Sequence, residues 1–203
     1  EVFEDNLSEI KKSNILRKLK LKKNKFFLVS FHREENINSS NFNKMISILN
    51  NLEKIYDIPI IVSTHPRTRN KINESNFILN KNIKLIKPQS FTNYINLQLN
   101  SKLVLSDSGT INEESSILNF PAINIRDAHE RPEAMEETSV MMTGMNCERV
   151  LQAIEILMSQ KRDNDRTLNL VNDYKNKNIS EKILRIILSY TDYIQKKTWK
   201  NFL

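Results

Sequence analysis

The chain has 203 residues, of which 39% are hydrophobic and 27% charged, values that are ordinary for a folded globular protein of one large or two small domains. No run of residues approaches the roughly 18 apolar positions of a membrane-spanning helix, and no signal-peptide pattern opens the chain. The net charge of +7 is compatible with nucleic acid binding, but the basic clusters are not interleaved with the aromatic side chains that a single-strand reader needs.

Residues 1–25 are predicted to form an amphipathic lead-in helix and a connection. Much of the positive charge lies on this segment, and its basic residues include Lys11, Lys12, Arg17, Lys18, Lys20, Lys22, Lys23 and Lys25. We interpret them as a solvated face, or as a surface complementary to an acidic partner, in preference to a DNA-binding surface. A second basic cluster lies near the C-terminus and consists of Lys196, Lys197 and Lys200. Because the chain begins with Glu1 and not with Met, we expect a processed chain or a piece of a longer one.

Residues 26–161 alternate between apolar runs that predict strands and segments that predict helices. The expected strands are Phe26–Phe31, Ile58–Thr64, Ile83–Ile86, Leu103–Ser106, Ala122–Ile125 and Val140–Thr143. Apolar residues at three- and four-residue spacing predict one helix that begins near Ser40 and another that begins at Asn146. Apolar strands with little alternation, separated by helices, indicate a parallel sheet covered on both faces. The sequence therefore predicts an α/β, Rossmann-like doubly wound domain, whose ligands bind at the carboxyl ends of the strands.

Residues 162–203 are predicted to form a C-terminal helical tail. Residues 162–178 are polar and rich in Asn and predict a helix fragment with a loop, whereas Ile179–Trp199 predicts one long helix or a helix pair. Apolar side chains surround much of this last helix, which is more than the core of one domain needs. We therefore expect the tail to pack on a second body.

The turn after the fourth predicted strand is the most informative motif of the chain. Its residues are Ser106-Asp107-Ser108-Gly109-Thr110, and helix-forming residues follow at once. Backbone N–H groups and the positive end of a helix dipole then point at one spot, which suits an anion, and the glycine and the hydroxyls help an anion to approach. Glu114, about one turn inside the helix, would repel a bare phosphate and favours a ligand with hydroxyls beside its phosphates, such as a nucleotide. The alternative is an ordinary capping turn.

Three further polar clusters follow predicted strands. The first, Ser30-Phe31-His32-Arg33-Glu34-Glu35-Asn36, contains a histidine that can donate to a phosphate or transfer a proton near neutral pH. The second, Ser63-Thr64-His65-Pro66-Arg67, fits a binding loop or a helix with Pro in its first turn. The third, Arg126-Asp127-Ala128-His129-Glu130-Arg131-Pro132-Glu133, contains an arginine, Arg131, that is placed to clamp a diphosphate. Each cluster has a plainer interpretation as a solvated or salt-bridged loop, but the shared position favours one common site.

Metal and nucleophile motifs are not found in the sequence. The three histidines fall on separate predicted loops without a Cys partner, and neither a nucleophile elbow nor a Walker loop is present, so no metal or cofactor is expected. The single cysteine, Cys147, cannot form an internal disulfide, which makes a reducing cytoplasm the default compartment.

Taken together, the motifs at residues 31–36, 106–114 and 126–133 resemble those of the non-hydrolysing UDP-N-acetylglucosamine 2-epimerase family, in order and spacing across nearly the whole chain. The resemblance implies two Rossmann-like domains that face each other across a cleft, in the GT-B architecture of many glycosyltransferases. This chain is similar to the C-terminal, nucleotide-binding domain, and its tail would pack on the N-terminal domain of a cytoplasmic homodimer. In the family, UDP is eliminated from the sugar to leave a 2-acetamidoglycal, and re-addition of UDP inverts C2.

The resemblance also implies roles for individual residues. His32 matches the catalytic histidine, which would stabilise the leaving UDP. The positions that it places around UDP are Gln89, Tyr94, Ser108, Gly109, Thr110, Glu114 and Arg131. Within this set, the turn at residues 108–110 would bind the diphosphate with Arg131 beside it, and Glu114 would hold the ribose hydroxyls.

Of these positions, Gln89 matches the family pattern, whereas Tyr94 and Thr110 depart from it. Gln89 falls at the position that contacts uracil, and Tyr94 stands where the family commonly has Phe against the base. Thr110 replaces a common second glycine and adds a side chain near the phosphate. The carboxylates that act on C2 belong to the N-terminal domain, so none is assigned in this chain.

The resemblance to one branch of the family narrows the range of candidate substrates further. Ser139-Val140-Met141-Met142 and the tail Ser189–Ile194 with Trp199-Lys200 are most similar to the branch that forms UDP-N-acetyl-L-fucosamine from UDP-2-acetamido-2,6-dideoxy-L-talose, for capsule and O-antigen sugars. The abundance of Lys, Asn and Ile suggests an AT-rich bacterial genome. Two alternatives stay open, a UDP-sugar-dependent glycosyltransferase domain and a non-catalytic UDP-binding module. The pair of motifs at residues 32–36 and 129–133 favours the epimerase.

Overall fold

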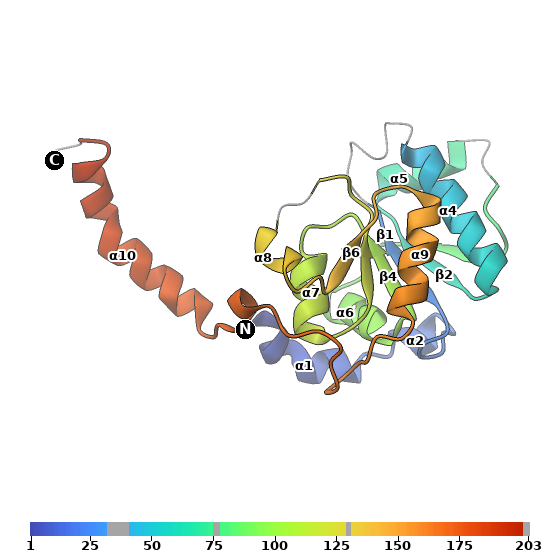
Figure 1. Cartoon of the computed structure of the whole chain (residues 1–203), viewed down its shortest axis with the longest axis horizontal. Coiled ribbons are helices and arrows are strands. Elements are labelled where there is room, and N and C mark those ends of the chain that lie inside the picture. The colour runs from blue at the N-terminus through green and yellow to red at the C-terminus, as the bar shows by residue number, and fades with distance from the viewer. Residues whose placement is uncertain (32–40, 75–77, 129–130, 201–203) are drawn as a thin grey trace.

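The computed structural model describes residues 1–31, 41–74, 78–128 and 131–200 (Figure 1). These residues form one six-stranded sheet in the order β3-β2-β1-β4-β5-β6, in which every pair of neighbours is parallel. The strands are β1 (Phe27–Ser30), β2 (Ile60–Ser63), β3 (Ile83–Ile86), β4 (Leu103–Ser106), β5 (Ala122–Asn124) and β6 (Val140–Met142). This is the strand order of a doubly wound Rossmann fold, so the predicted fold class is confirmed.

The central strands are apolar on both faces, and this is why the sheet is covered on both sides. In β1, Phe27 and Val29 contribute to one hydrophobic core, while Leu28 between them contributes to a second core on the opposite face. All residues of β1, β2, β4 and β5 are buried. Side chains alternate across a strand, so a strand whose residues are all buried must lie between two layers of helices.

One face of the sheet is covered by α4 (Asn41–Tyr56), α5 (Pro66–Glu74) and α9 (Cys147–Leu157). Helices α4 and α9 lie side by side over this face (Figure 1) and bury Leu49 and Ile154 in the first core. The predicted start of α9 is confirmed, because the Asn146 side chain caps the helix by accepting a hydrogen bond of 3.0 Å from the backbone N–H of Arg149.

The opposite face is covered by α2 (Ile15–Lys18), α6 (Phe91–Asn100) and α7 (Ile111–Leu118). The short α8 (Pro132–Met135) lies beside α7 (Figure 1). The lead-in helix α1 (Val2–Lys12) packs on α6. Its contacts include stacked rings of Phe3 and Phe91, with centroids 5.8 Å apart, and a hydrogen bond of 2.7 Å from the Asn96 amide to the Ile10 carbonyl. The first 25 residues are thus tied to the layer that contains α6.

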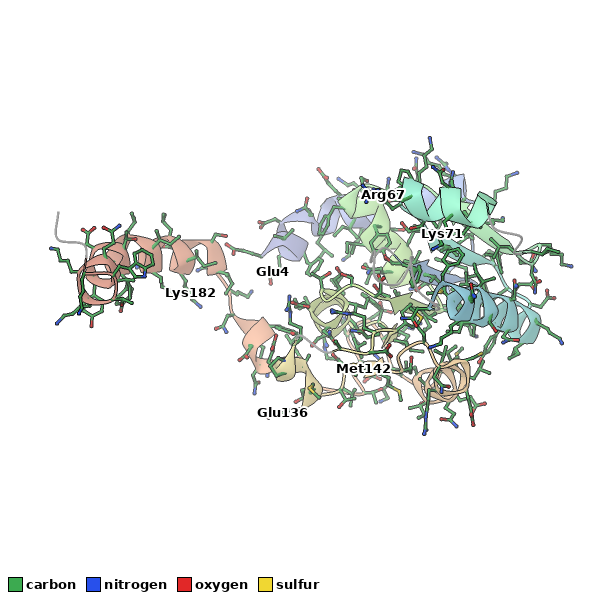
Figure 2. All side chains as sticks on the ribbon, turned by 90° about the horizontal axis from the view of Figure 1, so that it is seen from above. Glu4, Arg67, Lys71, Glu136, Met142 and Lys182 are labelled. Carbon is green, nitrogen blue, oxygen red and sulfur yellow. The ribbon has the colours of Figure 1, made fainter. Side chains whose placement is uncertain are left out.

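The C-terminal tail consists of the 3-10 helix η1 (Asn172–Lys175) and the single long helix α10 (Ile179–Lys197). Helix α10 stands clear of the sheet and its covering helices, as Figure 1 shows, and Figure 2 shows the same for Lys182 from above. None of its residues is buried. Within the described residues, no helix is both long and apolar enough to cross a membrane.

Candidate functional site

The strand order places a topological switch point at the carboxyl ends of β1 and β4. These two strands are neighbours, while the next strands, β2 and β5, lie on opposite sides of them, so the chain connections diverge at this point. In open α/β sheets, ligands bind at such a switch point. The two chain segments are joined there, because the N–H of Asp107 donates to the carbonyl of Ser30 over 3.2 Å.

The turn after β4 lies at this switch point and is shaped by its own side chains. The backbone N–H of Ser108 donates to the hydroxyl of Ser106 over 3.1 Å, and the hydroxyls of Ser108 and Thr110 are 2.9 Å apart. Thr110 occupies the N-cap position of α7, but its hydroxyl is directed to Glu114 instead of capping the helix. The N–H groups of the first helical turn therefore do not have this side chain as their acceptor, an arrangement that suits an anionic ligand at the start of α7.

Glu114 lies inside the first turns of α7 and accepts two side-chain hydrogen bonds. The Thr110 hydroxyl donates to its Oε1 over 2.7 Å, and the Gln98 amide donates to its Oε2 over 2.5 Å. Burial raises the pKa of the Glu114 carboxyl, while these two hydrogen bonds lower it and Glu113 raises it further. A carboxyl group that accepts a hydrogen bond on each oxygen is arranged as an ionised carboxylate. Each oxygen retains a lone pair that can accept a further hydrogen bond from a ligand hydroxyl.

Arg131 is brought to the same region from the start of α8. Its Nε donates to Oε1 of Glu113 over 2.6 Å, and about one third of the Arg131 side chain is exposed. The hydrogen bond and the charge of Glu113 raise the pKa of the Arg131 guanidinium. Because Glu113 precedes Glu114 in α7, this ion pair anchors the guanidinium of Arg131 to the first turns of that helix.

Tyr94 and Gln89 come from the segment that follows β3. The half-buried Tyr94 on α6 forms side-chain hydrogen bonds with Ser30 and Gln98, and burial raises the pKa of its hydroxyl. Its phenol thus reaches from α6 to the carboxyl end of β1, next to the switch point. Gln89 lies near the carboxyl end of the edge strand β3, where its amide donates to the carbonyl of Lys87 over 2.7 Å.

Of the three histidines in the other clusters, only His65 lies within the described residues. His32 and the rest of residues 32–36 lie outside the described residues, as do His129 and Glu130. The exposed His65 precedes α5, which begins at Pro66, so the interpretation of that cluster as a helix start fits. Within the described parts of the chain, no three His, Cys, Asp or Glu side chains gather as a metal-binding group.

Gln98 is the site residue that the sequence reasoning missed. It lies on the buried face of α6 between Leu97 and Leu99 and is fully buried, yet it contacts Glu114. The sequence did contain a signal for it, since Gln98 is a polar residue within a run of apolar positions that face the core. A buried amide needs a hydrogen-bond partner, so such a position indicates a polar contact in the interior. The identity of that partner depends on how α6 and α7 pack.

A doubly wound parallel sheet with a strand–turn–helix motif at its switch point defines a Rossmann-like domain. Residues 2–188 match the family model described as UDP-N-acetylglucosamine 2-epimerase. The chain therefore belongs to the UDP-N-acetylglucosamine 2-epimerase family, an isomerase family, and fits its C-terminal domain.

Known relatives agree with this assignment. A curated UDP-N-acetylglucosamine 2-epimerase from Methanocaldococcus jannaschii is 36% identical over 173 residues, which cover 83% of this chain and 45% of the relative. The structure of UDP-N-acetylglucosamine 2-epimerase from Rickettsia bellii has a TM-score of 0.89 and 45% identity and covers 98% of this chain and 54% of that one. The M. jannaschii enzyme in complex with UDP-GlcNAc and UDP has a TM-score of 0.77 and 31% identity, covering 91% and 51%. The chain thus spans about half the length of the relatives that it matches.

Proposed function

We propose that this chain is the UDP-binding domain of a UDP-N-acetylhexosamine 2-epimerase. The observation that carries the proposal is that the turn at residues 108–110 follows β4 at the switch point of the sheet, is hydrogen-bonded to Glu114, and is followed by Glu113, which pairs with Arg131. The solved complex of the M. jannaschii relative with UDP-GlcNAc and UDP supports the ligand class.

Each group of the site suits one part of UDP. The N–H groups at the start of α7 and the hydroxyls of Ser108 and Thr110 donate to the diphosphate, and Arg131 neutralises its charge. Glu114 accepts hydrogen bonds from the ribose hydroxyls. A carboxylate suits this role better than a neutral or basic side chain, because both of its oxygens are acceptors. Tyr94 and Gln89 lie toward the uracil end. In this arrangement the site binds the leaving group of the reaction.

The reaction is elimination followed by re-addition. A base removes the proton from C2, the C1–O bond breaks with its electron pair going to the UDP oxygen, and a 2-acetamidoglycal remains. UDP then adds back at C1 while a proton is delivered to the other face of C2. His32 stabilises the departing UDP, because a histidine can donate a proton or a hydrogen bond near neutral pH. The groups that act on C2 come from the other domain of the enzyme.

The tail joins this domain to the other half of the enzyme. Residues 1–25 are the lead-in segment, residues 26–161 bind UDP, and residues 162–203 pack on the N-terminal domain. An apolar stripe on α10 is exposed, and it consists of Ile179, Ile183, Ile186, Ile187, Tyr190, Tyr193 and Ile194. Such a face on a helix that stands clear of its own domain is typical of an interaction surface. The complete enzyme forms a homodimer in the cytoplasm.

The particular hexosamine is UDP-2-acetamido-2,6-dideoxy-L-talose, converted to UDP-N-acetyl-L-fucosamine. The support is the sequence of β6 with the residue before it, Ser139–Met142, and of the tail. Parallel assays of the complete enzyme with this substrate and with UDP-N-acetylglucosamine test the assignment, and preference for UDP-N-acetylglucosamine would overturn it.

Removal of Arg131 is expected to weaken UDP binding. UDP should bind the chain in the micromolar to millimolar range, and Arg131→Ala should weaken binding by about 1–3 kcal/mol, because a charge-assisted contact with the diphosphate is lost. Titration calorimetry measures both values. Arg185→Ala is the control, because Arg185 pairs with Glu181 on the exposed helix α10. A folded chain that binds no UDP would contradict the proposed function.

Replacement of Glu114 is expected to separate recognition of ribose from recognition of phosphate. In Glu114→Gln the amide offers one acceptor oxygen and a mismatched donor, so UDP affinity should fall, whereas affinity for inorganic diphosphate should hold or rise because a negative charge is removed. Both affinities are measured by calorimetry. Glu148→Gln, which changes an exposed acid in the first turn of α9, is the matched control. Equal weakening of both ligands would assign Glu114 a purely structural role.

A further inference from the structure

Gln98 is an unusual residue for the core position that it holds. Its side chain is fully buried on α6, next to the core residues Ile95 and Leu97. The amide nitrogen donates to Glu114, whereas the amide oxygen is buried without a hydrogen-bond partner among the described residues. A buried polar atom without a partner opposes folding, so packing alone would favour Leu or Met at this position. The amide adds the hydrogen bond to Glu114 and a contact with the Tyr94 hydroxyl, and of these two partners Glu114 is the carboxylate that it holds.

The two oxygens of Glu114 have partners of different kinds. Oε2 receives its hydrogen bond from Gln98, which lies in the interior, and Oε1 receives its hydrogen bond from Thr110, which is exposed at the turn. The Gln98 contact fixes the rotation of the carboxylate, since one oxygen is held inside. The other oxygen then lies on the side of the exposed Thr110 hydroxyl. Thr110 also lies 2.9 Å from the Ser108 hydroxyl, so its hydroxyl has a second neighbour to which it can turn.

We propose that Gln98 is the positioning residue of the ribose site: it holds Oε2 of Glu114 so that Oε1 faces the ribose 2′- and 3′-hydroxyls of the nucleotide. Thr110 keeps Oε1 occupied before the ligand arrives and turns its hydroxyl toward Ser108 and the diphosphate afterwards. The inference rests on the proposed role of Glu114 as the acceptor of the ribose hydroxyls. Its consequence is a preference for ribonucleotides that depends on a residue remote from the ligand.

Positioning by Gln98 also links the preference to pH. The carboxyl of Glu114 faces Gln98 and Tyr94 from α6, Thr110 from the turn and Glu113 from its own helix. Burial raises the pKa of Glu114 and the Gln98 hydrogen bond opposes this rise, so loss of the donor raises that pKa further. Since only the ionised form accepts two hydroxyls, a variant without the donor should lose its preference at a higher pH than the parent chain.

The experiment compares UDP with 2′-deoxy-UDP, both bound to the 203-residue chain and followed by calorimetry across pH. The parent chain should prefer UDP by about tenfold, and Gln98→Leu should reduce the preference to about twofold or less with little change for the deoxynucleotide. Gln98→Glu is the conservative variant. Its carboxyl should donate to Glu114 when protonated, which restores the preference at mildly acidic pH, and should repel Glu114 when ionised, which abolishes the preference at alkaline pH.

The outcomes separate this inference from the proposed function. If Glu114→Gln keeps the preference for UDP, the ribose role of Glu114 is wrong. If Glu114→Gln loses the preference and Gln98→Leu keeps it, the positioning role of Gln98 is wrong while that of Glu114 stands. Equal loss of UDP, deoxy-UDP and diphosphate in Gln98→Leu would overturn the inference, because Gln98 would then only support the fold. If Gln98→Leu does not fold, the pH response of Gln98→Glu decides, and a preference that does not change with pH overturns the inference.

Discussion

The 203-residue chain is expected to epimerise neither UDP-N-acetylglucosamine nor UDP-2-acetamido-2,6-dideoxy-L-talose by itself. Joined to the polypeptide that completes the length of its relatives, it is expected to exchange the C2 proton of its substrate with solvent deuterium, and His32→Ala should slow this exchange by orders of magnitude. General acid–base catalysis contributes about 10²–10⁴-fold, and an enclosed, oriented site contributes more. Both contributions need groups on the two sides of a cleft. Deuterium incorporation at C2, followed by NMR, measures the rate.

The control for His32 is another histidine of this domain. His65 precedes α5 and is exposed, so His65→Ala should leave the exchange rate unchanged. Turnover by the purified chain alone would mean that the groups acting on C2 are already present in it. Exchange that is insensitive to His32→Ala would remove that residue from the mechanism. Transfer of the sugar to an acceptor without exchange at C2 would favour the glycosyltransferase alternative.

The fold was predictable because its signals are local. Each core strand is a short apolar run without polar alternation, and each predicted run contains the strand observed there, with ends that differ by at most two residues. Strand ends depend on neighbouring strands, which explains these differences. In the C-terminal tail, the local sequence pattern did not decide the number of helices. Residues 179–197 form one helix, and the choice between one helix and two depends on whether residues in the middle of the segment break it.

The candidate site was predictable only in part. The turn after β4 was visible because its glycine and hydroxyl residues follow a buried strand directly. The ion pair between Arg131 and Glu113 joins residues 18 positions apart, and the Gln98–Glu114 hydrogen bond joins residues 16 positions apart. Both contacts depend on the packing of α6, α7 and α8, which no local pattern encodes. The role of His32 stays a prediction from the sequence, since that residue lies outside the described parts of the chain.

Replacement by Ala is expected to lower the free energy of unfolding strongly at one leucine of this chain and hardly at all at another. Leu105 lies in the centre of β4 and has no exposed surface, whereas 74% of Leu188 on α10 is exposed. Leu105→Ala removes methyl groups from a packed core and leaves a cavity, so the free energy of unfolding should fall by about 2–5 kcal/mol. Leu188→Ala creates no cavity and should change that free energy by less than about 0.5 kcal/mol.

Urea unfolding of both variants, with the slope compared with that of the parent chain, measures the two values. An unchanged slope shows that each substitution changes stability and not the compactness of either state. If Leu188→Ala costs as much as Leu105→Ala, helix α10 is packed in solution, either on its own domain or on a second copy of the chain. Its apolar face would then not be available to the N-terminal domain. A loss that grows on dilution would identify the second copy as the partner, because association depends on concentration and intramolecular packing does not.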